Sequence, residues 1–268
     1  MLSASAAALV AAILYIAVSL LQARRAARRS EASPAPIYSL AGVAVLLHAY
    51  AAFSGLTADD GVSFSLFRAG SLIFWMVNIS LLISLSWRPL QNLMVVLFPI
   101  SALAVMLAAL VPADGALLTD LSGGMLAHIG TSVLAYAVLA IAAVQAGAVA
   151  AQDYQLRHRH TRGLVQLLPP LQLMESMLFE IVWVGLGLLT LAIASGFIFL
   201  DDIFAQHLVH KTVLSICAWL LFATLLWGHH QLGWRSQVAA RFTLGGFVAL
   251  ALAYAGSKFV LELVLQRG

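Results

Sequence analysis

Residues 124–150 read GMLAHIGTSVLAYAVLAIAAVQAGAVA, a run without a single Asp, Glu, Lys or Arg. As an α-helix at 1.5 Å per residue the run reaches about 40 Å, which exceeds the ~30 Å hydrocarbon core of a bilayer. It is too long and too uniformly apolar for a strand of a membrane barrel. The stretch therefore predicts a membrane-spanning helix.

Stretches of the same character lie on both sides of it. Each reaches the about 20 predominantly apolar residues that a membrane-spanning helix needs. They cover residues 4–22, 37–55, 64–86, 91–111, 174–200, 208–228 and 243–264. Together with 124–150 they predict an all-α, polytopic bundle of about eight transmembrane helices that forms a single integral membrane domain over residues 1–268. No internal repeat at a fixed period is evident, which disfavours an inverted-repeat transporter.

The composition agrees with a membrane protein. The chain is 62% hydrophobic and 9% charged, with a mean hydropathy of +0.98, whereas a soluble domain is nearer one-quarter charged and under half apolar. The net charge of +3 is scattered at helix ends and forms no basic stripe. Cys217 is the only cysteine, which excludes an intrachain disulfide and a CxxCH haem attachment site. Water-soluble enzymes, secreted disulfide scaffolds, disordered tails and nucleic-acid binders are all excluded.

The charges between the spans predict the orientation. The positive charges of the first span follow its apolar stretch, as in an uncleaved anchor whose N-terminus lies outside. The predicted inner connections then hold Arg24, Arg25, Arg28, Arg29, Arg88, Arg157, Arg159, Arg162, Arg235 and Arg241. The predicted outer connections hold Asp59, Asp60, Asp114, Asp120, Asp201 and Asp202. This asymmetry predicts that both termini face outward.

Ionisable side chains inside a span are costly, and their default interpretation is functional. Those near the predicted outer ends of the spans are Arg68, His128, His207, His210 and Lys211. His207 and His210 are three residues apart, so they share one helical face. His48 is deeper, because its distance along the helix from the predicted inner end of the second span is about 16 Å.

This set of residue types suits haem. Iron takes one or two axial imidazoles, cations attract the two propionates, and apolar helix faces cover the macrocycle. The alternative is that the three outer histidines are interfacial residues that hydrogen-bond to loops. A zinc site lacks its third and fourth ligands, and a proton or ion relay lacks a chain of carboxylates at the midplane.

Three stretches carry a resemblance to a known family. They are HIGTSVLAYAVLAIAAVQAGAVAAQDYQLR (128–157), GLGLLTLAIASGFIFLDDIFAQHLVHKTVLSICAWLLFATLLWG (185–228) and LLHAYAAFSGLTADDGVSFSLFRAGSLIFW (46–75). On these the chain resembles the cytochrome c assembly superfamily, the haem-handling membrane proteins of the CcsA, CcmC and HemX-like type, and in particular its YpjD-like branch of bacterial inner-membrane proteins. The resemblance implies a multi-pass protein of the bacterial inner membrane.

The resemblance also implies roles for individual residues. His128 matches the first outer haem histidine of the family, which precedes a Ser-x-x-x-Tyr stretch (Ser132 to Tyr136 here). His48 matches a histidine that members keep in an early span. Lys211 and Trp219 match the Lys of an Asp-Pro-Lys-Glu segment and a Trp of the following helix.

The chain departs from the family pattern at three places. Residues 199–210, FLDDIFAQHLVH, contain no tryptophan where the family has a tryptophan-rich motif. No histidine lies near residues 265–266, and Trp227 stands where a second membrane histidine is expected. These departures favour a HemX-like role, associated with haem synthesis or its regulation, over full haem export.

The sequence thus favours a non-enzymatic membrane protein that binds b-type, non-covalent haem. His128 is the expected axial ligand, and His210 or His207 its partner. His48 would serve a deeper position, and Arg68 and Lys211 would hold the propionates. Expected partners are membrane lipids and haem-synthesis or cytochrome-maturation membrane proteins. The alternatives are a scaffold or regulatory subunit that keeps the fold without haem, and a small-molecule transporter.

Overall fold

The computed structural model describes residues 3–30, 32–58, 61–63, 65–112, 117–118, 122–159, 168–199 and 209–256. Eight helices in these ranges are long and apolar enough to cross a membrane, which confirms the predicted polytopic helical architecture. The helices fall into two compact units, unit 1 within Met1–Asp120 and unit 2 within Leu121–Gln266.

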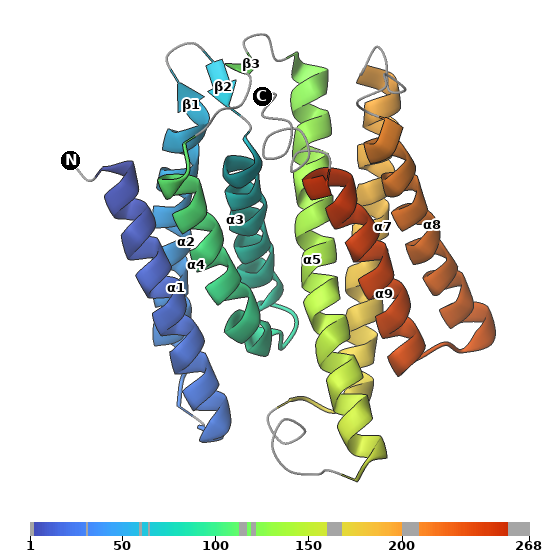
Figure 1. The fold of residues 1–268 in the computed structure, drawn as a ribbon. Coiled ribbons are helices and arrows are strands. Elements are labelled where there is room, and N and C mark those ends of the chain that lie inside the picture. Colours follow the sequence, from blue (N-terminus) through green and yellow to red (C-terminus); the bar gives the residue numbers. More distant parts are fainter. Residues whose placement is uncertain are drawn as a thin grey trace. The chain divides into compact units, whose positions relative to one another are not determined.

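Unit 1 is a bundle of four helices (Figure 1): α1 (Ala4–Ala27), α2 (Ala35–Leu56), α3 (Leu66–Ser84) and α4 (Met94–Leu110), the last preceded by the 3₁₀ turn η1 (Gln91–Leu93). Both α1 and α3 pack against α2 and α4. Ala7, Ala8 and Ala11 of α1 are fully buried. Such small side chains allow helix backbones to approach closely in a membrane.

Three very short strands connect the helices of unit 1 at one end, here called the strand end. β1 (Thr57–Ala58) pairs with β2 (Gly61–Ser63), and β2 pairs with β3 (Leu117–Leu118), both antiparallel. The sequence did not predict these strands. They are very short and lie in the connections, whereas long apolar runs mark only the membrane spans.

Unit 2 contains α5 (Gly123–Arg157), α7 (Leu171–Phe199), α8 (Val209–Leu232) and α9 (Ser236–Ala251), the last followed by a π-helical turn, η2 (Leu252–Gly256). Both α5 and α8 pack against α7 and α9 (Figure 1). The long α5–α7 contact depends on Gly185, where a Cβ would collide with the side chain of Leu139.

The helix that contains the start of the last predicted span, at residue 243, begins earlier, since α9 starts at Ser236. Glu175 of α7 explains the earlier start. Its Oε1 accepts hydrogen bonds from the Ser236 amide, at 2.8 Å, and from the Ser236 hydroxyl. This cap satisfies a donor that a helix N-terminus would otherwise leave unpaired. The helix therefore begins before its apolar run does.

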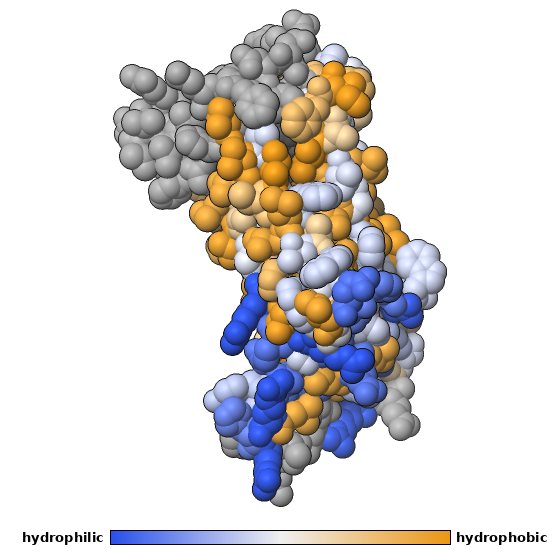
Figure 2. All heavy atoms as spheres, turned by 90° about the vertical axis from the view of Figure 1, so that its right-hand side faces the viewer, coloured by the Kyte–Doolittle hydropathy of each residue, from blue (hydrophilic) through white to orange (hydrophobic). Residues whose placement is uncertain are grey.

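The surface of the protein separates apolar from polar side chains. On the face drawn in Figure 2, hydrophobic residues form a band, and hydrophilic residues gather below it. Exposed apolar side chains of α8 and α9 include Leu220, Trp227, Leu244 and Val248. In water such a surface would be unfavourable, so it is expected to face lipid.

Candidate haem-binding pocket

A cavity of about 330 Å³ lies within unit 2, where α5 and α8 begin and α7 and α9 end. Met125, His128, Ser132 and Tyr136 line it from α5. These residues follow one another at three- and four-residue steps, so they occupy one face of the helix. Its volume lies at the low end of the range usual for small-molecule sites, ~300–1,000 Å³.

His128 is half-buried in this cavity, and α7 fixes its ring. Nδ1 lies 3.0 Å from the carbonyl oxygen of Ala192 and 3.1 Å from Oγ of Ser195. The Ser195 hydroxyl itself donates to the Ala192 carbonyl, at 2.9 Å. Because a carbonyl oxygen only accepts, Nδ1 carries the proton and donates it. In the neutral ring Nε2 then keeps its lone pair, which is the state that a metal ligand needs.

Polar groups on α8 complete the wall. Lys211, Thr212 and Ser215 line the cavity from this helix. Lys211 was predicted to serve the same site as His128, and the two side chains line one cavity. The helix is held against α7 by Trp219, whose Nε1 donates to Oγ1 of Thr190 at 2.8 Å.

The end of α9 meets α5 at the cavity through two tyrosines, Tyr136 of α5 and Tyr254 of η2. The Tyr136 hydroxyl donates to the carbonyl of Leu250 at 2.7 Å, and its ring meets that of Tyr254 edge to face, with centroids 5.9 Å apart. Tyr254 and Ala253, both in η2, line the cavity. The π-helical turn thus lies directly at the pocket, and such turns are frequent at functional sites.

His48 lies elsewhere, fully buried in unit 1. Its Nδ1 is 3.0 Å from the Tyr15 hydroxyl and its Nε2 is 2.9 Å from Oγ of Ser71. Both ring nitrogens are therefore hydrogen-bonded, and iron ligation at this position would require one of these bonds to break.

The remaining predicted site residues are Arg68, His210 and His207. Arg68 lies in the first turn of α3, in unit 1. His210 is the second residue of α8, and its side chain is not described. His207 lies outside the described residues, so its predicted pairing with His210 on one helical face is not tested.

Among the residues that sequence reasoning missed are Ser195, which hydrogen-bonds to His128, and Tyr254, which lines the cavity. Ser195 and Tyr254 are uncharged, so a search for ionisable side chains inside spans passes over both. A usable signal exists in α7, where Leu189, Ala192 and Gly196 recur at helical spacing and line the cavity. In the described part of the chain no three His, Cys, Asp or Glu side chains gather as metal ligands do.

The sequence was compared with known proteins. Residues 35–265 match the family described as Cytochrome C assembly protein. The chain is 34% identical to "Inner membrane protein YpjD" of Escherichia coli (strain K12) over 224 residues, 83% of this chain and 85% of that protein. It is 32% identical over 140 residues, 52% of each chain, to an "Uncharacterized 28.8 kDa protein in nifR3-like 5'region" of Azospirillum brasilense. No solved structure matches.

Proposed function

The chain belongs to the cytochrome C assembly protein family, and from this premise we propose that it is a haem-binding, non-enzymatic, multi-pass protein of the bacterial inner membrane. Its role would lie in haem handling or cytochrome maturation. The observation that carries the proposal is the orientation of His128, whose Nδ1–H is held by the Ala192 carbonyl in a cavity that Lys211 also lines.

The donor set of the pocket fits haem. His128 would be an axial ligand through Nε2, with Ser195 and the Ala192 carbonyl as the groups that orient it. Lys211 would attract a propionate. Leu189, Ile193 and Phe197 supply apolar wall for a macrocycle.

The haem would be of the b type, because the only cysteine, Cys217, cannot form a CxxCH attachment. When bound, haem supplies an iron centre whose behaviour the axial ligand and its hydrogen bonds tune. The protein's own contribution is to bind and orient the group and to limit its exposure to water. Partners would be membrane lipids and membrane proteins of haem synthesis or cytochrome maturation.

The test is an absorbance spectrum of the protein purified in mild detergent, oxidised and then reduced with dithionite, with a pyridine haemochrome assay for stoichiometry. We expect a Soret band that His128→Ala weakens strongly. His158→Ala is the matched control, because His158 is an exposed histidine at the opposite end of α5. A wild-type spectrum that stays featureless after haem addition would refute the proposal.

A second candidate function is a scaffold that keeps the fold without haem. It is favoured by the absence of tryptophan from residues 199–210. A membrane partner that co-purifies with a haem-free chain would support it.

A further inference from the structure

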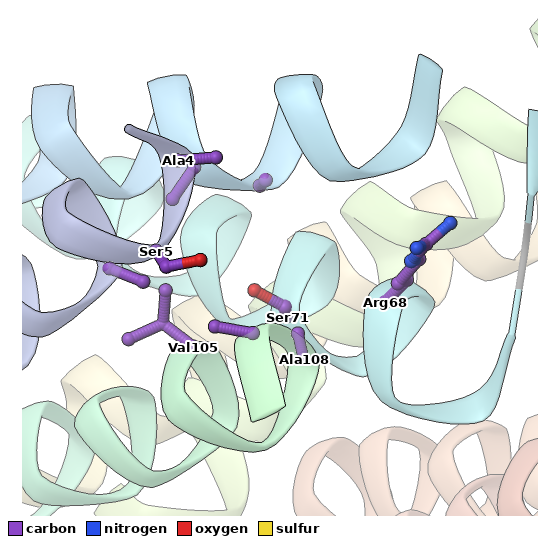
Figure 3. Close-up of a pocket in the computed structure, with 10 residues that line it drawn as sticks. Ala4, Ser5, Arg68, Ser71, Val105 and Ala108 are labelled. Carbon is purple, nitrogen blue, oxygen red and sulfur yellow. The ribbon is translucent and has the colours of Figure 1, made fainter. Parts of the chain in front are cut away.

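A second cavity, of about 170 Å³, lies inside unit 1 at its strand end (Figure 3). All four helices of the unit line it, mostly with alanine. The residues that bear polar atoms on their side chains are Ser5 of α1 and Arg68 and Ser71 of α3. In Figure 3 the hydroxyls of Ser5 and Ser71 point toward each other across the cavity. The residues that line this cavity belong to unit 1, whereas those that line the His128 pocket belong to unit 2.

Arg68 brings a positive charge to the cavity without a partner. Its Nε is buried and has no hydrogen-bond acceptor in the described residues, and no ion pair is found for it there. An unpaired, partly buried guanidinium is costly, and the cost falls when an acceptor or an anion meets its donors.

The hydrogen bonds that join Tyr15, His48 and Ser71 have a definite donor-to-acceptor direction. Tyr15 is fully buried. Its hydroxyl lies 3.0 Å from Nδ1 of His48 and also meets the side chain of Asn78, whose Oδ1 already accepts from the Ser101 hydroxyl. Since a buried O–H must donate, His48 is the Nε2–H tautomer in its neutral form. Nε2–H therefore donates to Oγ of Ser71.

This direction leaves the Ser71 proton available. Ser71 is 1% exposed and lines the cavity, and its one hydrogen bond within the described residues is the bond that it accepts from His48. Arg68 and Ser71 both line the cavity and both bear hydrogen-bond donors, although in Figure 3 the Arg68 guanidinium extends away from the Ser71 hydroxyl. A cation or a pure donor would leave these groups unsatisfied, whereas an oxyanion would accept from both.

We propose that the cavity of unit 1 binds a small oxyanion, a carboxylate or a phosphate group, held by the Arg68 guanidinium and by a Ser71 hydroxyl that the Tyr15–His48 pair orients. The volume equals that of several water molecules at ~30 Å³ each, which suits a group of this size. Two sources share this chemistry: a free anion and the phosphate of a lipid headgroup.

The test uses the full chain without haem, in a detergent that contains no phosphate. Inorganic phosphate is titrated at constant ionic strength, and binding is read from the ³¹P NMR line width and from the unfolding temperature. The wild type is expected to bind saturably. Arg68→Gln is expected to weaken binding roughly tenfold or more, the loss of a hydrogen bond to a charged group. Ser71→Ala is expected to weaken it by a smaller factor.

Two further variants separate the site from general effects. Ala108→Leu fills the cavity from α4 while Arg68 and Ser71 keep their side chains, and it is expected to abolish binding. Arg241→Gln removes an exposed arginine of α9 and is expected to bind as the wild type does. Circular dichroism verifies that each variant is folded.

A competition experiment with a lipid distinguishes a lipid headgroup from a free anion as the occupant. If added phosphatidylglycerol displaces phosphate from the wild type but has no site in Arg68→Gln, the proposal is supported with a lipid headgroup as occupant. If phosphate binds saturably and the lipid does not displace it, the proposal is supported with a free anion. Absence of saturable binding by either probe, or an unchanged affinity in Arg68→Gln, overturns it.

Discussion

Removing the hydroxyl of Tyr15 is the sharpest perturbation of unit 1. Tyr15→Phe keeps the ring, which meets Phe98 and His48 edge to face with centroids 5.0 and 5.6 Å apart. It deletes the hydroxyl that donates to Nδ1 of His48, at 3.0 Å, and that also meets the side chain of Asn78. The imidazole, fully buried, then has one nitrogen without a partner.

The expected cost follows from that unpaired atom. Leaving a buried polar group unsatisfied costs about 1–3 kcal/mol, while single hydrogen bonds between membrane helices average about 0.6 and reach about 1.7 kcal/mol. We therefore expect Tyr15→Phe to lower the free energy of unfolding by about 1–2 kcal/mol. Tyr38→Phe, at a half-buried tyrosine whose hydroxyl has no hydrogen bond to the described residues, is expected to change the free energy of unfolding by less than about 0.5 kcal/mol.

The assay is reversible unfolding in mixed micelles as the mole fraction of dodecyl sulfate rises. A double-mutant cycle with Ser71→Ala tests the chain through His48. Because both residues bond to the same ring, we expect a coupling energy of at least about 0.5 kcal/mol. The hydrogen-bond chain would be refuted if Tyr15→Phe were as stable as the wild type. It would also be refuted if the free-energy losses of Tyr15→Phe and Ser71→Ala simply added in the double mutant.

Three further predictions use the same unfolding assay or a haem titration. Gly185→Ala should be about 1–3 kcal/mol less stable than Gly187→Ala, because a Cβ at Gly185 overpacks Leu139 while one at Gly187 meets nothing within 4 Å; equal stabilities would contradict the close α5–α7 contact. Glu175→Ala should cost about 1.5–3 kcal/mol by uncapping α9, and Glu175→Gln should cost less because its amide oxygen still accepts; identical losses would show that the acceptor is unimportant. Ser195→Ala should weaken haem binding by about two- to tenfold and Ser195→Thr should restore it, provided the hydroxyl orients the axial ligand.

The number of spans and two residues of one cavity were predictable from local properties. A long, predominantly apolar run can satisfy its backbone in a bilayer only as a helix, so eight such runs predict eight helices. Placing an imidazole or an ammonium inside a span is costly, so His128 and Lys211 were predicted to be functional residues. Those two side chains do line one cavity.

Helix boundaries were less predictable where a distant residue decides them. The start of α9 depends on Glu175, which is far away in sequence, and no apolar run marks Ser236. Hydropathy averages over windows, whereas a cap is a single contact between two helices.

The sequence by itself determined that this is a polytopic helical membrane protein, because hydrophobicity and length act locally along the chain. Only the tertiary structure decided what each buried imidazole contacts. His128 and His48 are equivalent as residue types, yet the first has one ring nitrogen held by α7 at the edge of a cavity, and the second has both nitrogens bonded inside a four-helix core. The difference arises from neighbours on other helices, and packing alone brings those neighbours into hydrogen-bonding distance.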